Sequence, residues 1–213
     1  MTTILTHAEP GQKIVLRNIS WDLYERILKA NHDRRVPRFT YDKGQLEIMS
    51  PSDQHEQLID AIRHLIQLVA EELRINLKGF GSTTFRRWDI RRGFEPDACF
   101  YSKNLGRVFG KRSKLDLRTD PPPDLVIEID IGASSLNKEA IMEQFGVPEL
   151  WRYRRRSWRI LVLGPNGYKE RPQSSILPGL TAKVLSTLMQ QSRVLEPLAW
   201  NRFIRKAARE MKA

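Results

Sequence analysis

Cysteine and long apolar runs are nearly absent from this sequence. The 213 residues contain one cysteine, Cys99, which excludes an internal disulfide and a cysteine-rich zinc site and is typical of a reducing compartment. No run of about 18 apolar residues is present that could cross a membrane. The first residues lack the basic and apolar segments of a signal peptide. We therefore expect a cytoplasmic protein that has no membrane partner.

Acidic residues are scarcer than basic ones. The sequence has 25 Asp and Glu against 36 Lys and Arg, a net charge of +11 at pH 7. Such a surplus is typical of proteins that bind nucleic acid, although it also fits a soluble basic protein or one that touches acidic membranes. Repeats and low-complexity tracts are absent, and no linker is evident. We expect one mixed α/β domain over residues 20–213, preceded by an N-terminal arm, residues 1–19.

The segment DLVIEIDI, residues 124–131, is the centre of the chain's organisation. Apolar residues, several of them β-branched, alternate there with polar ones, which predicts a strand. Glu128 and Asp130 then share one face, about 7 Å apart, opposite the apolar face. Two carboxylates so close disfavour joint ionisation unless a cation or a proton intervenes, so they form one half of a candidate metal site. Alternatively, they are the solvent-exposed face of an antiparallel strand.

Hydrophobic spacing and turn residues predict the remaining elements. The expected helices cover residues 21–30, 54–76, 136–145, 181–190 and 197–211. The expected strands cover residues 38–41, 45–49, 80–90, 95–101, 149–154, 158–163 and a short segment from residue 167. Residues 102–123 are expected to form a long basic loop.

Two polar residues, His55 and Glu56, occupy the first turn of the helix predicted over residues 54–76. Each has a structural explanation. Asp53 as N-cap and Glu56 three residues later fit a capping box, and His55, four residues before Ile59, fits a half-buried histidine. Either residue is also a candidate for a site at this end of the helix.

Three short motifs, taken together, resemble one family. They are Ser50-Pro51-Ser52 followed by His55-Glu56, then Glu95-Pro96-Asp97-Ala98, and the central stretch that closes on Gly146-Val147-Pro148-Glu149-Leu150-Trp151. In order and spacing they are similar to the Uma-type proteins, a family abundant in cyanobacteria that is assigned to the PD-(D/E)XK nuclease superfamily. The resemblance runs from about residue 20 to residue 205. It implies a restriction-endonuclease-like fold, a central mixed β-sheet flanked by helices in a single domain.

The same resemblance implies a metal-dependent nuclease site. Asp97 matches the first acid of the family and Glu128 the second. Such acids hold Mg²⁺ or Mn²⁺, which lowers the pKa of a bound water and stabilises charge on the scissile phosphate. Asp130 is a third candidate metal ligand. Glu56, with His55 beside it, is the candidate for the acid at a helix start that often joins the other two in catalysis.

This chain departs from the family pattern at two positions. Asp130 stands where the catalytic lysine is expected, two residues after the second acid. Lys138, at the start of the following helix, is therefore the candidate for a lysine that has migrated. Met142 stands where a tyrosine is usual, which removes a hydroxyl that could have held a phosphate or a water.

Two arginine clusters are candidates for contact with DNA. They are Arg86, Arg87, Arg91 and Arg92 around Trp88, and Arg154, Arg155 and Arg156 between two predicted strands. An aromatic ring among cations suits phosphate contact and base stacking. A solvated basic surface is an equally open explanation.

Two functions follow as hypotheses. The first is a Mg²⁺-dependent DNA endonuclease that hydrolyses phosphodiester bonds. The alternative is a catalytically degenerate nuclease fold that binds nucleic acid or a protein partner without cleavage. Metal binding through Asp97 and Glu128 discriminates between them. A hydrolase of small phosphoesters is a third interpretation and requires a deep pocket. A homodimer is expected only by analogy with endonucleases that cut both strands.

Overall fold

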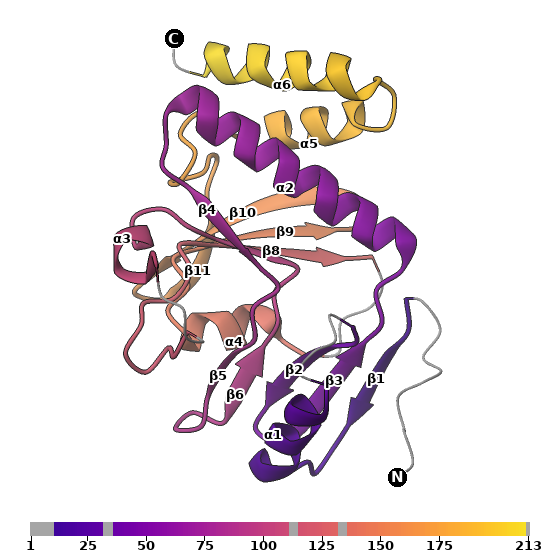
Figure 1. Cartoon of the computed structure of the whole chain (residues 1–213), viewed down its shortest axis with the longest axis vertical. Helices are drawn as coiled ribbons and strands as arrows, with labels where there is room; N and C mark the ends of the chain where they lie inside the picture. Colours follow the sequence, from indigo (N-terminus) through magenta and orange to yellow (C-terminus); the bar gives the residue numbers. More distant parts are fainter. Residues whose placement is uncertain (1–10, 32–35, 111–114, 132–135, 212–213) are drawn as a thin grey trace.

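The computed structural model of the chain describes residues 11–31, 36–110, 115–131 and 136–211. They form a single mixed α/β domain with a six-stranded and a five-stranded sheet, which confirms the predicted fold class (Figure 1). Within these residues, no helix is both long and apolar enough to span a membrane.

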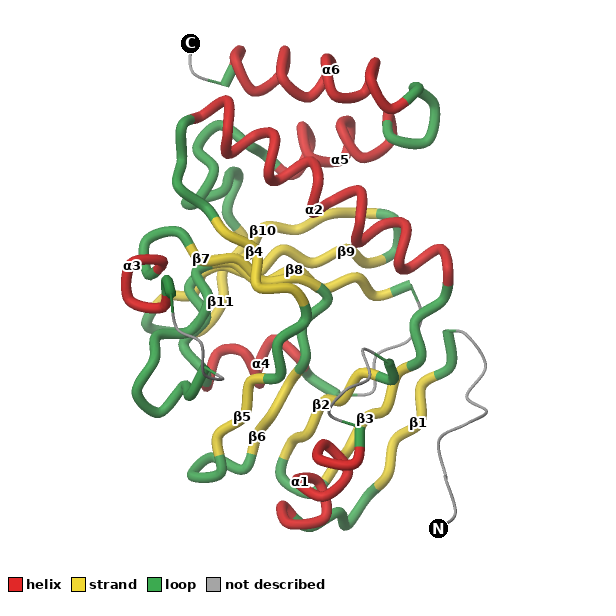
Figure 2. The backbone as a smooth tube through the Cα atoms, viewed as in Figure 1, coloured by secondary structure: helices red, strands yellow, loops and turns green. Residues whose placement is uncertain are grey.

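The six-stranded sheet is the central, mixed one (Figure 2). Its order is β11-β10-β9-β8-β7-β4. The strands are β4 (Lys78–Gly81), β7 (Ala98–Tyr101), β8 (Leu125–Asp130), β9 (Glu149–Arg154), β10 (Ser157–Gly164) and β11 (Gly167–Glu170). β8 and β9 are parallel because the helix α4 (Lys138–Gln144) connects them, as parallel strands require a crossover. The other neighbouring pairs are antiparallel.

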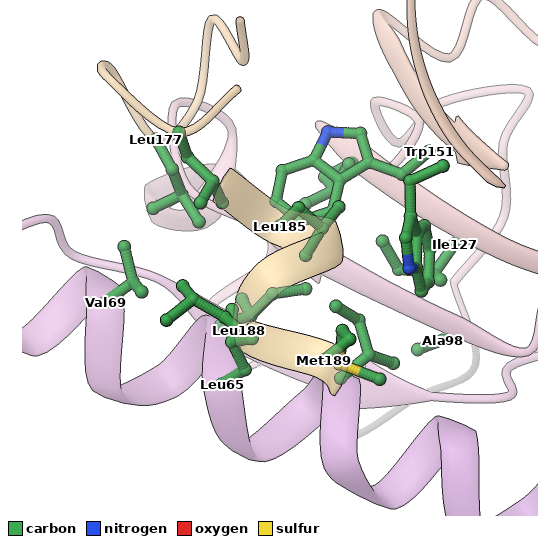
Figure 3. Packing of buried hydrophobic residues seen from close by; sticks show 14 of the residues in the cluster. Leu65, Val69, Ala98, Ile127, Trp151, Leu177, Leu185, Leu188 and Met189 are labelled. Carbon is green, nitrogen blue, oxygen red and sulfur yellow. The ribbon is translucent and has the colours of Figure 1, made fainter. Parts of the chain in front are cut away.

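Two helices cover one face of this sheet, α2 (Asp53–Leu73) and α5 (Ala182–Gln191), and α6 (Pro197–Glu210) packs on their outer side (Figure 1). The apolar stripe predicted for the longest helix is buried against the sheet, together with side chains from α5. Figure 3 shows Leu65 of α2 and Leu188 of α5 packed near Ile127 and Trp151 of the sheet. Burial of such a side chain stabilises the fold by about 1.5–3 kcal/mol.

The opposite face of the sheet is covered by α4, so β8 is buried on both sides. Ile127 and Ile129 enter the core under α2, whereas Val126 enters a second core under α4. Glu128 and Asp130 continue the second face and are 1% and 2% exposed. The alternative in which they form a solvent-exposed strand face is therefore wrong.

The five-stranded sheet is antiparallel and lies against the same side of the central sheet as α4. Its order is β1-β3-β2-β6-β5. The strands are β1 (Lys13–Leu16), β2 (Arg38–Asp42), β3 (Gln45–Met49), β5 (Phe85–Arg87) and β6 (Arg92–Phe94). The helix α1 (Trp21–Ala30) packs on it, and the Ser20 hydroxyl caps α1 by accepting from the N–H of Leu23. β2 and β3 confirm the strands predicted over residues 38–41 and 45–49, and they pair as a hairpin.

The N-terminal segment differs from the expected arm. Residues 13–16 pair with β3 from Lys13↔Met49 to Leu16↔Leu46, so they belong to the five-stranded sheet. Residues 1–10 of the predicted arm lie outside the described residues. A strand this short at the edge of a sheet carries little local signal, and its partner residues are 30 to 36 positions away along the chain.

One predicted strand is divided between the two sheets, and another begins later than expected. The predicted strand 80–90 overlaps β4 of the central sheet and β5 of the other, and Gly81 adopts the positive φ at which the chain turns. The predicted strand 95–101 is preceded by β6 and begins only at Ala98 as β7. The predicted loop 102–123 contains a short helix, α3 (Leu105–Val108), and its residues 111–114 lie outside the described residues.

Close packing of α1 on β6 gives a prediction for Gly93. A Cβ added at Gly93 would overlap the phenol of Tyr24, which is fully buried. Gly93→Ala should therefore destabilise the protein by about 1–3 kcal/mol in urea unfolding. Gly106→Ala is the matched control, because nothing lies within 4 Å of a Cβ there. It should be neutral or stabilising by up to about 1 kcal/mol. Equal stability of the two variants would contradict the packing.

Candidate active site

Acidic and basic side chains converge where the two sheets meet. Glu128 comes from β8, Asp97 from the residue before β7, Lys138 from the start of α4, His55 from the first turn of α2, and Arg38 from β2. Each of the five is between 1% and 6% exposed. Buried charges are costly unless they are paired, so their contacts define the site.

The carboxylate of Asp97 joins several elements. One oxygen, Oδ1, accepts a hydrogen bond from the Arg38 guanidinium. The other, Oδ2, accepts from the backbone N–H of Ile129 at 2.6 Å and lies 3.2 Å from Nε2 of His55. The Asp97 carbonyl accepts from Arg63 of α2 at 2.6 Å. Asp97 is thereby held from both sheets and from α2.

Glu128 and Lys138 form a buried ion pair. The lysine Nζ lies 2.6 Å from Oε2 of Glu128. A cation in the first turn of a helix is disfavoured by the helix dipole, so the pair with Glu128 explains why Lys138 is tolerated at the start of α4. The structure thus brings the candidate lysine to the second candidate acid, ten positions along the chain. Its catalytic role stays a prediction.

Asp130 lies in a neighbouring charge network. Its Oδ2 accepts from Nε of Arg152 at 2.7 Å, and its Oδ1 lies 3.8 Å from Nζ of Lys13. Arg152 also donates to Glu139 at 2.7 Å. Oδ1 of Asp130 is buried and has no hydrogen-bond donor among the residues described.

His55 and Glu56 are placed differently from each other. His55 is buried, with Nε2 also 3.1 Å from the Ile129 carbonyl oxygen. Glu56 has a side chain 45% exposed and accepts from Nη2 of Arg38 at 2.8 Å. The predicted capping box is wrong, because Ser52 is the N-cap and its hydroxyl accepts from the N–H of His55. The Glu56 side chain contacts Arg38 instead of capping the helix.

The environment separates the pKa values of the two central acids. Burial raises the pKa of Glu128 to about 7, supported by the charges of Asp97 and Asp130 and opposed by Lys138. For Asp97, burial acts in the same direction, but its contact with His55 and the charges of Arg38 and Lys138 outweigh it and hold the pKa below its usual range. Burial would lower the pKa of Lys138, yet the nearby carboxylates raise it. A pair of acids with separated pKa values is typical of catalytic sites.

The oxygen atoms of these acids are of the kind that a hard cation prefers. Mg²⁺ prefers carboxylate oxygens, usually one or two from the protein with water and phosphate oxygens completing the shell. Asp97 and Glu128 supply such oxygens, and the buried Oδ1 of Asp130 lacks a donor. In chemistry the residues fit Mg²⁺ or Mn²⁺. Within the described parts of the chain, however, no three His, Cys, Asp or Glu side chains are grouped closely enough to hold a metal.

Sequence reasoning missed three charged residues that contact or influence the groups of the site. Arg38 and Glu47 lie in the β2–β3 hairpin and are buried, and the charge of Glu47 contributes to the raised pKa of Lys138. Arg152 is half of the network at Asp130. Apolar–polar alternation along the hairpin could not identify Arg38 as a buried residue, because both faces of β2 are buried.

The predicted arginine clusters fall in two places. On the β5–β6 hairpin, Arg86, Arg87 and Arg92 form ion pairs with Glu25, Asp89 and Asp42 at 3.1, 2.5 and 2.7 Å, while Arg91 is exposed. Arg154, Arg155 and Arg156 are exposed in the β9–β10 turn. In α6, Arg205 and Arg209 pair with acids of α2. Part of the excess positive charge is therefore neutralised by ion pairs within the molecule.

Comparison with solved structures defines the class of fold. A crystal structure described as that of a putative nuclease belonging to DUF820, from Anabaena variabilis, superposes with a TM-score of 0.56. The match covers 80% of this chain and 99% of the other, at 16% sequence identity. The fold is thus of the same α/β class as that nuclease-like protein.

The family follows from the sequence. The model of the Uma2 family, described as "putative restriction endonuclease", matches residues 21–194, and the chain belongs to this family. The resemblance stated from the motifs is thereby confirmed. No curated protein matches the chain.

The buried Arg38–Asp97 pair gives a second prediction. Arg38→Met removes the cation and leaves a buried carboxylate, so unfolding in urea should show a loss of about 3–5 kcal/mol. Arg87→Met is the control, because its pair with Asp89 is partly exposed and is worth no more than about 1 kcal/mol. A loss at Arg38 no larger than at Arg87 would show that Asp97 does not depend on this partner.

Proposed function

We propose that the protein is a metal-dependent endonuclease that hydrolyses phosphodiester bonds in DNA. The observation that supports this most is the buried group of Asp97, Glu128 and Lys138, in which an ammonium lies 2.6 Å from one of two acids. The family description and the net charge of +11 agree with a nucleic-acid substrate.

Each residue has a role in this proposal. Asp97 and Glu128 would hold Mg²⁺ or Mn²⁺, with Asp130 as a further oxygen ligand, and such a metal would supply a water of lowered pKa and stabilisation of charge on the phosphate. Lys138 stabilises negative charge on the attacking oxygen. His55 orients the Asp97 carboxylate through its contact with Oδ2. Glu56 holds Arg38 against Asp97.

A second candidate is a degenerate nuclease fold that binds nucleic acid or a protein without cleavage. Each of the three acids already contacts a cation of the protein, namely Arg38, Lys138 or Arg152. No three-ligand metal group is found among the described residues. Cations of the protein thus balance the charges of the three acids, which favours the second candidate.

Lys138→Ala separates the metal ligands from the lysine. Lys138 is not an oxygen donor, so its loss should leave Mn²⁺ affinity within a few fold while slowing single-turnover cleavage of plasmid DNA about 10²–10³-fold. Glu128→Ala removes a ligand and should abolish both metal binding and cleavage. The assay is run with Mg²⁺, Mn²⁺ or EDTA.

Two outcomes contradict parts of the proposal. Cleavage by Lys138→Ala at the wild-type rate would remove the lysine from the mechanism. If wild type and Glu128→Ala are equally inert and neither binds metal, the degenerate binder is correct.

The raised pKa of Glu128 predicts how metal binding depends on pH. Below pH 7 the folded protein holds a proton on Glu128 that the metal must displace, so the apparent Kd for Mn²⁺ should rise about tenfold per pH unit. Above about pH 7 the carboxylate is ionised and the Kd should level off. Electron paramagnetic resonance of free Mn²⁺ measures this. Glu128→Gln keeps an oxygen ligand but cannot take up the proton, so it should bind Mn²⁺ more weakly and with a Kd independent of pH. A flat wild-type profile between pH 5 and about 8 would refute the prediction.

A further inference from the structure

The β9–β10 turn lies at the same end of the central sheet as the candidate active site. β8 and β9 are parallel and in register, with Asp130 opposite Arg154 and Ile129 opposite Tyr153. Arg155 and Arg156 then form the two-residue turn before β10. All three arginines are exposed.

The backbone of this turn is unfavourable for the residues it contains. Arg155 and Arg156 have φ values of 51° and 63°. Turns with positive φ at both central positions favour Asn-Gly, because side chains with a Cβ are strained there. Strain held at exposed positions is a reason to look for function. Here it presents two guanidinium groups at the end of the sheet at which Asp130 lies.

A cleft begins at this turn. It has a volume of about 260 Å³ and is lined by Arg156, Arg193, the half-buried Tyr153, Trp158 and apolar side chains of α2 and α5. The Tyr153 and Trp158 rings are 5.0 Å apart. Arg193 also lines a second groove of about 660 Å³ between α2 and the α5–α6 loop, so the two hollows share one wall.

The charges lining these two grooves differ from those at the other arginine cluster. None of the residues that line them is Asp or Glu. The hollows beside Arg86 and Arg91 instead contain acids such as Asp22 and Asp89. In the described part of the chain, Arg155, Arg156 and Arg193 have no carboxylate at ion-pair distance. Their charge is available to a phosphate.

We propose that the grooves beside the β9–β10 turn, which lie on the α2 and α5 face of the central sheet, bind an unpaired segment of DNA that passes around the end of β8 and β9 to the active site on the other face. Arg155, Arg156 and Arg193 contact successive phosphates, and one base lies against Tyr153. A base inside a duplex has both faces covered, so only an unpaired base fits an aromatic-lined cleft. This inference rests on the proposed nuclease function and names its substrate class as single-stranded or flapped DNA.

The double variant Arg155→Asn/Arg156→Gly tests the turn. It restores the residues that the turn favours, so the melting temperature should rise by about 2–4 °C. Anisotropy titrations of labelled oligo-dT in EDTA should show weaker binding. The slope of log affinity against log salt should become shallower by about 1.4, since each phosphate contact on a single strand contributes about 0.7. Loss of binding in a more stable protein excludes misfolding as the cause.

Two controls separate charge and stacking. Arg26→Ala/Lys29→Ala removes two charges from α1, on the other sheet, and should leave the salt slope unchanged. Tyr153→Leu should weaken oligo-dT binding at least about fivefold without changing the slope, because stacking is worth about 1–3 kcal/mol per base. Tyr153→Phe should bind like wild type.

Four results overturn the proposal. The first two concern Arg155→Asn/Arg156→Gly: a lower melting temperature, or unchanged binding of oligo-dT. The third is a change of the salt slope in Arg26→Ala/Lys29→Ala as large as in the turn variant. The fourth is duplex DNA bound as tightly as oligo-dT together with unchanged binding by Tyr153→Leu. Metal-dependent cleavage is measured in parallel. Absent cleavage with the expected binding changes refutes only the nuclease function, whereas cleavage with unchanged binding by the turn variant refutes only the groove.

Discussion

The carboxylate of Asp97 is the group on which the arrangement of the site depends. It accepts from Arg38 of the five-stranded sheet and from the N–H of Ile129 in the central sheet, and it lies beside His55 of α2. Three elements distant in sequence are therefore held at one buried point. A buried carboxylate is stable only when both oxygens are satisfied. The position of one sheet relative to the other therefore depends on the charge of the Asp97 carboxylate.

Other buried acids show what distinguishes this group. Glu149 is fully buried and accepts from neutral donors, the Trp151 indole and two serines. Asp124 likewise accepts from backbone and amide N–H groups. Such carboxylates fix loops to the sheet. Asp97 and Glu128 instead have arginine and lysine partners, and their pKa values are shifted in opposite directions, which is the physical basis for placing chemistry there.

The positive surplus is distributed unevenly. Several arginines of α6 and of the β5–β6 hairpin contact acids of neighbouring elements, and these pairs hold the surface of the fold together. The arginines at the β9–β10 turn have no such partners in the described residues and adopt a strained backbone. Net charge alone therefore indicates a class of partner, and pairing in three dimensions decides which surface is available to it.

The sequence by itself determined the local elements and the family. Alternation in β8, the stripe on α2 and the motifs around Asp97 and Glu128 are local patterns, so they can be read without a structure. Only the tertiary structure decided that β1 joins a sheet, that the predicted strand 80–90 is shared between two sheets, and that Glu128 and Asp130 are buried. It alone paired Arg38 with Asp97. Pairing across sheets depends on contacts between residues far apart in the chain, and local periodicity carries no information about them.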